Sequence, residues 1–346
     1  MEKHPIAFVG LRFGKVMLDG LTRNPDWPFR LAAVCDTDEE KREACAAAYG
    51  VPGHSGLEPI LSDPDIPAVA LITPPNGRAK LIRQCLEAGK HVMTTKPFEM
   101  DPAAAESVLG LAKEKGLAVQ LNSPAPRTQP WVAQVREWRD WHRLGRPSLV
   151  TWQTQMPYHE EADGSWYDDA ELCPLAPMLR LGVYAIDDML EVLDDDDPRA
   201  VTAMGSRIRT GRPTSDVGCM QVRFASGCLA SLSVTLCTEA CRSAQTMSVH
   251  YERGAVYRHL PPDLGGVSGW RLKLVSGGLE TPVTIEDKVA PKIGYDWEHF
   301  AAWVRGECPS NDLTPERLLR SVRILEAMKR AESSRREEAV VQTQKG

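Results

Sequence analysis

The sequence lacks the cysteine pattern of a disulfide-rich or zinc-binding domain. Its nine cysteines are an odd number, and none of them forms a Cys-x-x-Cys pair. The closest pair, Cys237 and Cys241, has no His or carboxylate beside it at ligand spacing. Free cysteines usually behave as small hydrophobic residues. We therefore expect reduced thiols, no disulfide framework and no metal site.

An excess of positive charge and long hydrophobic runs are missing as well. The chain has 41 Lys and Arg against 47 Asp and Glu, a net charge of -6, whereas nucleic-acid binders gain affinity from clustered cations. No apolar stretch approaches the ~20 residues of a membrane-spanning helix. The first residues, Met1 to Gly10, run into an apolar strand without the features of an export signal. We expect a cytoplasmic protein with no nucleic-acid or membrane partner.

What the sequence does have is length and an ordinary globular composition. Its 346 residues are 42% hydrophobic and 25% charged, which is enough for two hydrophobic cores and therefore predicts two domains. The first part alternates short apolar runs with amphipathic segments, a pattern typical of βαβ units. The expected strands are Ile6–Gly10, Arg30–Asp36, Ala68–Thr73, His91–Thr94 and Ala118–Asn122. The expected helices are Thr37–Tyr49, Ala79–Ala88 and Pro102–Lys115. Residues 1–123 are thus predicted to form an α/β Rossmann domain with a parallel sheet.

The second part of the sequence is richer in strands. The expected strands include Ser148–Gln155, Ala200–Arg209, Cys219–Phe224 and Cys228–Leu236, the last two joined by a hairpin turn at Ala225-Ser226-Gly227. Residues 124–346 are predicted to form an α+β domain with a large, mainly antiparallel open sheet. The four aspartates 194–197 are interpreted as a solvated loop. A last helix, Pro315–Ala331 with Thr314 as its N-cap, is expected to pack back on the first domain.

A glycine turn follows the first strand. Ile6 to Val9 leads into Gly10-Leu11-Arg12-Phe13-Gly14, where a dinucleotide fold turns its backbone under the pyrophosphate. The usual G-x-G-x-x-G pattern would need glycines at Arg12 and Lys15. Either these cations compensate by charge at the helix N-terminus, or they are ordinary exposed residues. Asp36, at the end of the second strand, can accept hydrogen bonds from ribose hydroxyls and would repel a 2′-phosphate, which favours NAD over NADP.

Three further motifs occur in order: Thr73-Pro74-Pro75-Asn76, Ala88-Gly89-Lys90-His91-Val92 and Thr95-Lys96-Pro97-Phe98. Their spacing resembles the Gfo/Idh/MocA oxidoreductases, with Thr95 in place of the usual Glu, over about residues 4 to 335. The resemblance implies an NAD(P)-dependent dehydrogenase or reductase acting on CH-OH groups, which transfers a hydride between nicotinamide and a secondary alcohol or ketone of a sugar, sugar acid or cyclitol. The implied cofactor-binding residues are Gly10, Arg12, Phe13, Gly14, Asp36, Thr73, Pro74, Pro75, Asn76, Lys96 and Pro97.

Lys96 is the expected catalytic residue. A lysine at the carboxyl end of a parallel strand points into the crevice where ligands bind. Partial desolvation there lowers a lysine pKa and lets the amine exchange a proton with a substrate oxygen. Without the resemblance, Lys96 would be interpreted as a surface lysine before a helix. Pro97 is expected to aim Lys96 through an unusual backbone geometry, such as a cis bond.

The segment Arg180 to Asp187 matches the spacing of the family's D-x-G-x-H-x-x-D helix. Tyr184 stands at the His position, and the resemblance implies that it pairs with Lys96 in proton transfer. Arg180 stands where the family has a carboxylate and stays protonated. Arg180 has three possible roles: gripping a substrate carboxylate or phosphate, lowering the phenol pKa of Tyr184, or forming a salt bridge with Asp187 or Asp168. Asp187 is expected to orient the substrate or other residues.

Residues 131–167 are rich in aromatic side chains, most of which we expect to pack inside the protein. The expected substrate-binding residues are Arg180, Asp187, Asn122, Tyr158, His159 and Trp166. The resemblance also implies a homodimer or homotetramer formed through the second sheet. Two other functions stay open. One is an NAD-recycling glycosidase or epimerase, and the other is a non-catalytic dinucleotide-binding regulator, suggested by the departures at positions 12, 15, 95 and 180.

Overall fold

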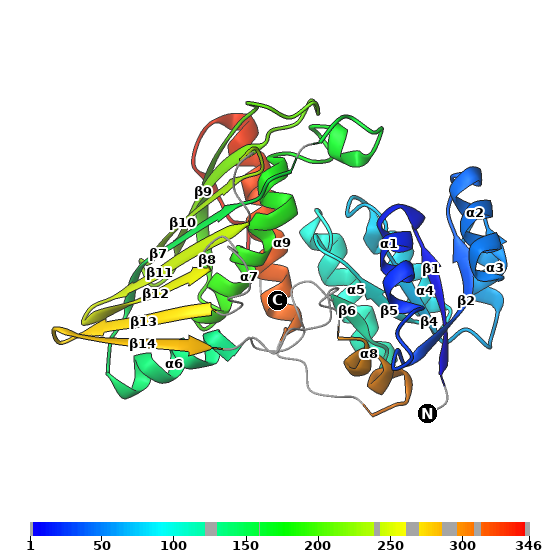
Figure 1. Ribbon diagram of the computed structural model, residues 1–346, viewed down its shortest axis with the longest axis horizontal. Coiled ribbons are helices and arrows are strands. Elements are labelled where there is room, and N and C mark those ends of the chain that lie inside the picture. Colours follow the sequence, from blue (N-terminus) through cyan, green and yellow to red (C-terminus); the bar gives the residue numbers. More distant parts are fainter. Residues whose placement is uncertain are drawn as a thin grey trace. The chain divides into compact units, whose positions relative to one another are not determined.

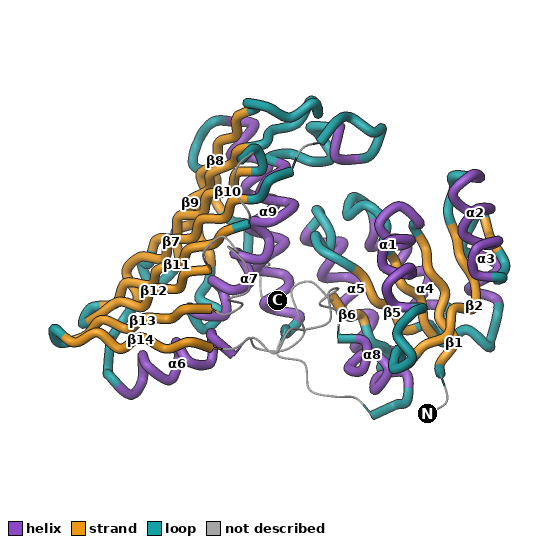
Figure 2. Tube along the Cα trace, viewed as in Figure 1, coloured by secondary structure: helices purple, strands orange, loops and turns teal. Residues whose placement is uncertain are grey.

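The computed structural model describes residues 3–121, 130–158, 160–238, 243–260, 270–285, 296–307 and 313–342. The chain forms two units, Met1–Arg127 with Ala290–Pro315, and Thr128–Val289 with Glu316–Gly346. Figure 1 and Figure 2 show that one unit is a parallel sheet with helices and the other a broad sheet with helices along one face. Within the described ranges, none of the helices is long and apolar enough to cross a membrane.

The first unit contains a six-stranded sheet in the order β3-β2-β1-β4-β5-β6, in which every neighbouring pair is parallel. Its strands are β1 His4–Val9, β2 Phe29–Cys35, β3 Gly53–His54, β4 Ala68–Leu71, β5 His91–Thr94 and β6 Val119–Leu121. This is the strand order of a dinucleotide-binding fold, and the order reverses between β1 and β4. The predicted Rossmann fold is confirmed.

The helices of this unit are α1 Leu11–Leu21, α2 Glu39–Tyr49, α3 Glu58–Ser62, α4 Arg78–Glu87, α5 Pro102–Lys115 and α8 Trp297–Val304. Three of them, α2, α5 and α8, begin after an aspartate whose side chain caps the first turn. Helix α5 shows the pattern best: the Asp101 side chain accepts hydrogen bonds from two first-turn amides, Pro102 is the first helical residue, and Gly116 ends the helix in the left-handed region at φ 65°. The prediction for this helix is confirmed at both ends.

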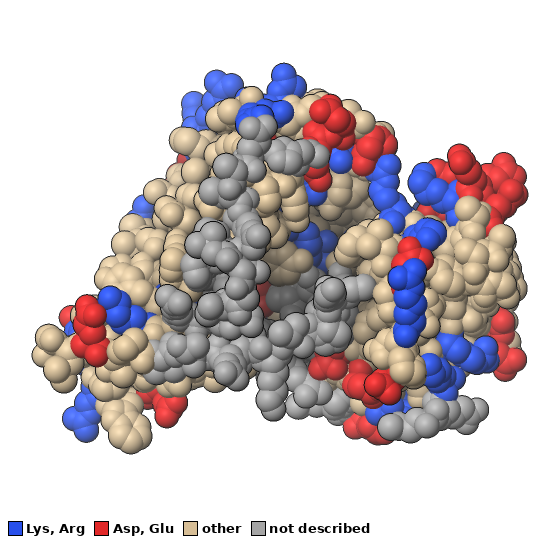
Figure 3. Space-filling view, in the orientation of Figure 1, with Lys and Arg blue, Asp and Glu red and all other residues tan. Residues whose placement is uncertain are grey.

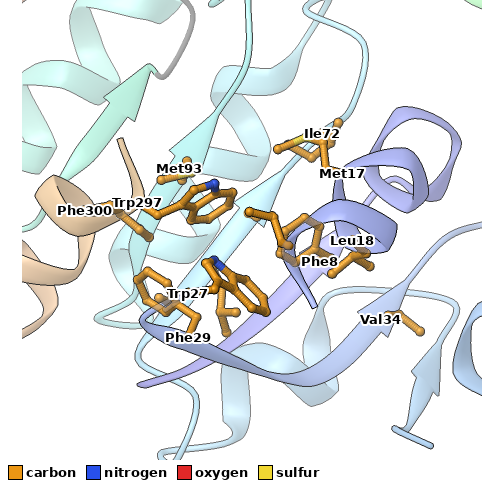
Figure 4. Packing of buried hydrophobic residues seen from close by; sticks show 14 of the residues in the cluster. Phe8, Met17, Leu18, Trp27, Phe29, Val34, Ile72, Met93, Trp297 and Phe300 are labelled. Carbon is orange, nitrogen blue, oxygen red and sulfur yellow. The ribbon is translucent and has the colours of Figure 1, made fainter. Parts of the chain in front are cut away.

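An aromatic cluster forms the core on one face of the parallel sheet. Trp297 stacks on Phe8 with ring centroids 6.0 Å apart, and Phe300 lies 5.6 Å from Phe29. Figure 4 shows these rings packed with Trp27 between the strands and α8. Helix α8 therefore belongs to the first unit. The predicted boundary, which assigned everything after residue 123 to the second domain, is wrong for this helix because its apolar face completes the first core.

The second unit contains a nine-stranded sheet in the order β14-β13-β12-β11-β7-β10-β9-β8-β15. Its strands are β7 Pro147–Gln155, β8 Pro198–Ser206, β9 Val217–Phe224, β10 Leu229–Thr235, β11 Ala244–Tyr251, β12 Gly254–Leu260, β13 Trp270–Ser276, β14 Leu279–Ile285 and β15 Glu338–Ala339. Neighbouring strands are antiparallel except for β7 and β10. The predicted α+β domain with a mainly antiparallel sheet is confirmed, including the hairpin between β9 and β10.

Helices cover one face of this sheet (Figure 1). They are α6 Pro130–Trp141, a 3-10 turn Trp166–Asp168, a π-helical segment Met178–Gly182, α7 Val183–Val192 and α9 Pro315–Ser334. Strand β9 shows the resulting alternation: Met220 and Val222 are buried, whereas Cys219, Gln221 and Arg223 are exposed on the other face. The second face of the sheet is therefore polar along this strand.

Arginines of the covering helices bind the acidic run before β8. Asp195 accepts two hydrogen bonds from Arg317 at 2.6 and 3.1 Å, and Asp197 accepts one from Arg320 at 3.0 Å. The interpretation of this run as a solvated loop holds only in part, because its carboxylates stay partly exposed but are bound by arginines that are distant in sequence. These pairs join α9 to the second unit, to which Glu316–Gly346 belongs. The predicted packing of this helix on the first domain stays a prediction.

The surface carries charges of both signs close together. On the face shown in Figure 3, Lys and Arg side chains lie next to Asp and Glu side chains on each unit. Two examples on the first unit are the ion pairs of Lys15 with Asp19, at 2.9 Å, and of Lys41 with Asp38. Each of these two pairs joins opposite charges about one helical turn apart.

Candidate functional site

A glycine joins β1 to α1 at the point where the strand order reverses. Gly10 has φ 89°, and a Cβ atom on it would lie 2.5 Å from the carbonyl oxygen of Ile72. The Gly10 N–H donates to Cys35 O at 2.9 Å, and the Ile72 N–H donates to Val9 O at 2.7 Å. Only glycine fits this turn. The carboxyl ends of β1, β2 and β4 are therefore held together at the N-terminus of α1.

Asp36 lies at this edge, as predicted from its place after β2. Its Oδ2 accepts a hydrogen bond from the Leu11 N–H at 2.7 Å, and its Oδ1 accepts one from the Asp38 N–H at 2.9 Å. Arg42 also donates to the Asp36 carbonyl at 3.1 Å. The carboxylate is thus fixed beside the first amide of α1, where the sequence predicted a ribose-binding group.

Arg12 and Lys15 stand at the two positions where the usual motif has glycine. Lys15 binds the Asp19 carboxylate one helical turn away, and Asp19 also accepts a hydrogen bond from the Tyr49 hydroxyl at 2.6 Å. The hydrogen bonds from Tyr49 and Lys15 lower the pKa of Asp19. For Lys15 this favours the interpretation as an ordinary exposed residue. Arg12 is exposed on the same helix, and Phe13 is 47% exposed.

The other predicted glycine of the turn has a different role from Gly10. A Cβ atom on Gly14 would lie 3.7 Å from the Ile72 side chain and 3.8 Å from Phe8, which are ordinary contact distances. Helix α1 therefore packs on the sheet at Gly14, but an alanine would also fit at this position.

Two unpartnered polar atoms lie in the loop after β4. Among the described residues, Thr73 Oγ1 and Asn76 Oδ1 are buried without a hydrogen-bond partner. Buried polar atoms nearly always have partners in folded proteins. Both residues belong to the segment predicted to hold the cofactor, next to the Gly10 turn. The polar groups at this edge are helix amides, a carboxylate and two oxygens without partners. This combination of hydrogen-bond donors and acceptors fits a dinucleotide.

Lys96 follows β5, the next strand along the same sheet edge, and is half-buried. The Lys96-Pro97 peptide bond is cis, as the sequence suggested. Two residues that sequence reasoning missed surround this loop: Arg78, at the start of α4, and Glu99. Both are buried, although residues of these types are almost never fully buried unless they are paired or hydrogen-bonded.

In the second unit, Tyr184 lies in the first turn of α7 and is half-buried. The π-helical segment with Arg180 directly precedes it, and such segments are frequent at functional sites. Asp187 lies one turn further along α7 and is buried. Burial and the neighbouring carboxylate of Asp188 raise the pKa of Asp187 well above its usual value, against the opposing effect of Arg317.

Arg180 is bound by a carboxylate that the sequence did not indicate. Both of its terminal nitrogens donate to the two oxygens of Glu160, one of them at 2.6 Å. Its guanidinium also lies over the rings of Tyr158 and Tyr167, at 4.8 and 4.5 Å from their centroids. Arg212 donates a further hydrogen bond to Glu160 at 3.0 Å. Burial raises the pKa of Glu160, but the hydrogen bonds and charges of the two arginines outweigh it and lower the pKa.

The space enclosed by these side chains is very small. Tyr158, Glu160, Tyr167, Arg180 and Arg212 line a cavity of about 10 Å³, on the order of one water molecule. A sugar does not fit there. Of the three roles open for Arg180, the salt bridge is present.

The predicted partners of Arg180, however, were wrong. Asp168 binds Arg212 at 2.7 Å instead, and Asp187 lies among the charges of α7 and α9. The backbone of Glu160 is held by the loop that carries Arg212, because the Gly211 N–H donates to the Glu160 carbonyl oxygen at 2.9 Å.

The remaining aromatic predictions have mixed outcomes. Trp131, Trp138 and Trp152 are buried as expected, but Trp141 is 79% exposed because it is the last residue of α6. Trp166 is half-buried and lies 4.3 Å from the Tyr167 ring. Asn122 and His159 lie outside the described residues. Across the described part of the chain, no three His, Cys, Asp or Glu side chains are grouped as for a metal ion.

A Rossmann unit with a glycine turn, joined to a unit with a large open sheet, is the architecture of a two-domain dinucleotide-binding protein. Residues 5–123 match the model of the oxidoreductase family with an NAD-binding Rossmann fold, and residues 132–257 match the GFO/IDH/MocA C-terminal domain. The chain therefore belongs to the Gfo/Idh/MocA oxidoreductase family.

Curated relatives are similar over part of the chain. It is 33% identical over 140 residues to the dehydrogenase aclE of Aspergillus oryzae, which is 38% of either chain. It is 30% identical over 146 residues to inositol 2-dehydrogenase of Rhizobium meliloti, which is 42% of this chain and 43% of that one. The matched region thus spans less than half the length of these relatives.

Solved structures are similar over nearly the whole chain. An oxidoreductase of Desulfitobacterium hafniense, described as NADPH-dependent, is 20% identical over 98% of both chains with a TM-score of 0.77. The aldose-aldose oxidoreductase of Caulobacter crescentus, solved with glycerol, is 20% identical over 98% of this chain and 100% of that one with a TM-score of 0.73. At these identities the likeness establishes the two-domain fold alone.

Proposed function

We propose that this protein is an NAD-dependent dehydrogenase or reductase that acts on a CH-OH group of a sugar, sugar acid or cyclitol. The observation that carries the proposal is the edge at Gly10, where the first amide of α1 meets the Asp36 carboxylate at the reversal of strand order. Ligands of doubly wound sheets bind at such a point. The names of the relatives, which include an inositol 2-dehydrogenase, support the substrate class.

The dinucleotide would be held by residues of the first unit. The proposed set is Gly10, Arg12, Phe13, Gly14, Asp36, Thr73, Pro74, Pro75, Asn76, Lys96 and Pro97. The α1 amides suit a diphosphate because a helix N-terminus favours anions. Asp36 suits ribose hydroxyls and disfavours a 2′-phosphate, which is the basis for preferring NAD to NADP. When bound, the nicotinamide would supply the hydride acceptor or donor.

Proton transfer is assigned to two side chains. We propose that the Lys96 amine takes the proton of the reacting hydroxyl, or returns it in the reverse direction, and that the Tyr184 phenol is a second acid or base. Asp187, which is buried on α7, is assigned an orienting role. The proposed substrate-binding residues are Asn122, Tyr158, His159, Trp166 and Arg180. The salt bridge of Arg180 with Glu160 would have to open before Arg180 could bind a substrate anion.

A substrate panel tests the proposal. The purified protein is mixed with NAD or NADP and with sugars, sugar acids and cyclitols, and the absorbance of reduced nicotinamide is followed. A steady increase in this absorbance supports the proposed dehydrogenase function. Product without an absorbance change would indicate the NAD-recycling glycosidase or epimerase instead. Tight cofactor binding without any turnover across the panel would indicate the non-catalytic regulator.

We also propose that the chain forms a homodimer or homotetramer through the open face of its second sheet. Uncharged polar side chains occupy the middle of that face, among them Thr151 and Ser248, whose hydroxyls lie 2.7 Å apart, with Gln153 and Ser233 nearby in the register. Such a surface can be buried without leaving an unpaired charge. Light scattering that gives the mass of a single chain would contradict this assembly.

The compartment is a separate proposal. Every cysteine in the described ranges is a free thiol, which supports a reducing environment such as the cytoplasm.

A further inference from the structure

A buried guanidinium links the loops after β4 and β5. Arg78 is the first residue of α4, and only 1% of its surface is exposed. Its Nη1 donates to the carbonyl oxygens of Thr95, at 2.5 Å, Phe98, at 3.1 Å, and Pro97. Its Nη2 donates to the carbonyl oxygen of Thr73. One side chain thus binds the backbone of both loops that carry the proposed cofactor site.

A buried carboxylate makes the opposite connection. Glu99 belongs to the loop after β5 and is also 1% exposed. Its Oε2 accepts from the Ala79 N–H at 2.7 Å, and its Oε1 accepts from the Gly77 N–H at 3.3 Å and the Met100 N–H at 2.7 Å. A carboxylate is favoured at a helix N-terminus, where amides lack helical partners. Glu99 therefore fixes the start of α4 to its own loop.

Together the two side chains form a reciprocal brace. Arg78 reaches from α4 to the β5 loop, and Glu99 reaches from the β5 loop to α4. Lys96 stands between Thr95 and Pro97, whose carbonyl oxygens both bind Arg78. The backbone on each side of Lys96 is held, and so is its separation from Thr73.

Charged side chains in a protein core need a physical explanation. A buried ionic group costs desolvation free energy, and well-packed apolar residues would often serve stability equally well. What the brace supplies in addition is a defined geometry, because a guanidinium donates in fixed directions. We propose that Arg78 and Glu99 are positioning residues that set the place of Lys96 relative to the Thr73–Asn76 loop. This inference rests on the proposed function for the role of Lys96.

The test compares Arg78 with a second arginine of the same helix. Arg83 is partly exposed at the surface, where it donates to Ser107 at 2.6 Å and pairs with Glu87 at 3.8 Å. The variants R78K, R78Q and the control R83Q are assayed for kcat and KM with the best substrate of the panel. Amide hydrogen exchange and Tm are measured on the same preparations.

The expected result is a loss of kcat of at least ~10-fold in R78Q, since misplacement of a reacting group by about 1 Å can cost far more. R78K, which keeps the charge, should retain more activity. Amide exchange should accelerate in residues 95–101 of R78Q and stay unchanged in α5. R83Q should stay within about twofold of the parent in kcat, because its side chain binds only surface groups.

Three outcomes would overturn the proposal. A lower Tm with unchanged kcat in the folded R78Q protein would mean that Arg78 serves stability alone. Unchanged exchange in residues 95–101 would mean that it does not hold the loop. E99Q is a second variant, which removes the charge of Glu99 but keeps the size of its side chain. It should also accelerate amide exchange in residues 95–101 and leave α5 unchanged. If neither R78Q nor E99Q folds, the pair serves the whole fold rather than the position of Lys96.

The exchange experiment needs no substrate, so it keeps this inference separate from the proposed function. If the parent protein turns nothing over but R78Q loosens residues 95–101, the proposed function fails and the brace stands. If the parent is active and R78Q matches it in kcat and exchange, the brace fails and the proposed function stands.

Discussion

The carboxylate of Asp36 accepts a hydrogen bond from the backbone N–H of Leu11, with 2.7 Å between oxygen and nitrogen. The end of β2 thus places a negative charge beside the N-terminus of the helix that follows β1. The same helix end is where we propose that a diphosphate binds. We propose that this one charge determines whether the site prefers NAD or NADP.

Replacing Asp36 with Asn should shift the preference between cofactors. The amide removes the charge that would repel a 2′-phosphate, while its oxygen can still accept a hydrogen bond from Leu11. We expect the ratio of the Kd values for NADPH and NADH to fall by at least ~10-fold, about 1.4 kcal/mol. Fluorescence titration measures both constants. E40Q, an exposed change on α2, is the control, and an unchanged ratio in D36N would contradict the assignment.

Gly10 and Gly14 should respond oppositely to alanine. At Gly10 a Cβ atom would meet the Ile72 carbonyl in a left-handed turn, so we expect G10A to lose at least ~2 kcal/mol of unfolding free energy and to bind cofactor poorly. At Gly14 the Cβ atom meets only ordinary contacts, and alanine favours a helix by up to about 1 kcal/mol. Urea unfolding of both variants checks this. Equal stabilities would refute the stated role of Gly10.

Lys96→Met should abolish proton transfer while leaving the cofactor bound. We expect kcat to fall by at least ~100-fold. The Kd for NADH should change much less than kcat, because Lys96 is only one of the residues proposed to hold the dinucleotide. The matched control is K80M, at an exposed lysine on α4. If K96M retains most of its turnover, Lys96 has no part in the mechanism.

Arg180 and Glu160 should be energetically coupled. Their side chains are 13% and 23% exposed, so removing either charge leaves its partner partly buried. A double-mutant cycle with R180M and E160Q should give a coupling of about 1–3 kcal/mol in unfolding free energy. Arg180 would instead be a substrate-binding residue if R180M raised KM for sugar acids and left KM for cyclitols unchanged.

Asp188 should make stability fall as the pH rises. Burial, with a further contribution from Glu191, raises its pKa to about 7 despite the opposing charge of Arg258. Asp188 in the unfolded chain has the usual pKa of 3.8 and releases its proton near that pH, whereas the folded protein keeps the proton up to about pH 7. The free energy of unfolding therefore decreases as the pH rises between these two values.

Asp188→Asn removes that titration. The Tm of D188N relative to the parent should be higher at pH 8 than at pH 4, because pH 4 lies close to the unfolded pKa of 3.8 and the unfolded parent still carries part of the proton there. Calorimetry at the two pH values measures the difference. E171Q, an exposed change in the same unit, should show no such trend. A gap in Tm between D188N and the parent that is equal at both pH values would contradict this account.

Local signals predicted much of the fold. Both ends of helix α5 could be predicted because Pro102 favours the first helical position and Gly116 favours the left-handed conformation that ends a helix. The two-residue β3 and the five-residue α3 were missed, since so few residues show no periodicity. The assignment of α8 failed for another reason: whether Trp297 packs on one core or another depends on tertiary structure and not on its neighbours in sequence.

The candidate site divides in the same way. The positions of Gly10, Asp36 and Lys96 at one sheet edge could be predicted because each follows a strand, and strand ends can be read from hydrophobic runs. Arg78, Glu99, Glu160 and Arg212 were missed because their partners are distant. The sequence alone does not show whether an arginine is buried or exposed. Only the tertiary fold brings carbonyl oxygens to Arg78 and a carboxylate to Arg180.

The aromatic core of the first unit is assembled from two separate stretches of chain. A fragment cut after Arg127 would retain all six parallel strands yet leave Phe8, Trp27 and Phe29 facing water where Trp297 and Phe300 now cover them. Exposed apolar patches of this kind promote aggregation. An autonomous nucleotide-binding half would therefore have to be engineered as a fusion, with residues 290–315 spliced back behind residue 127.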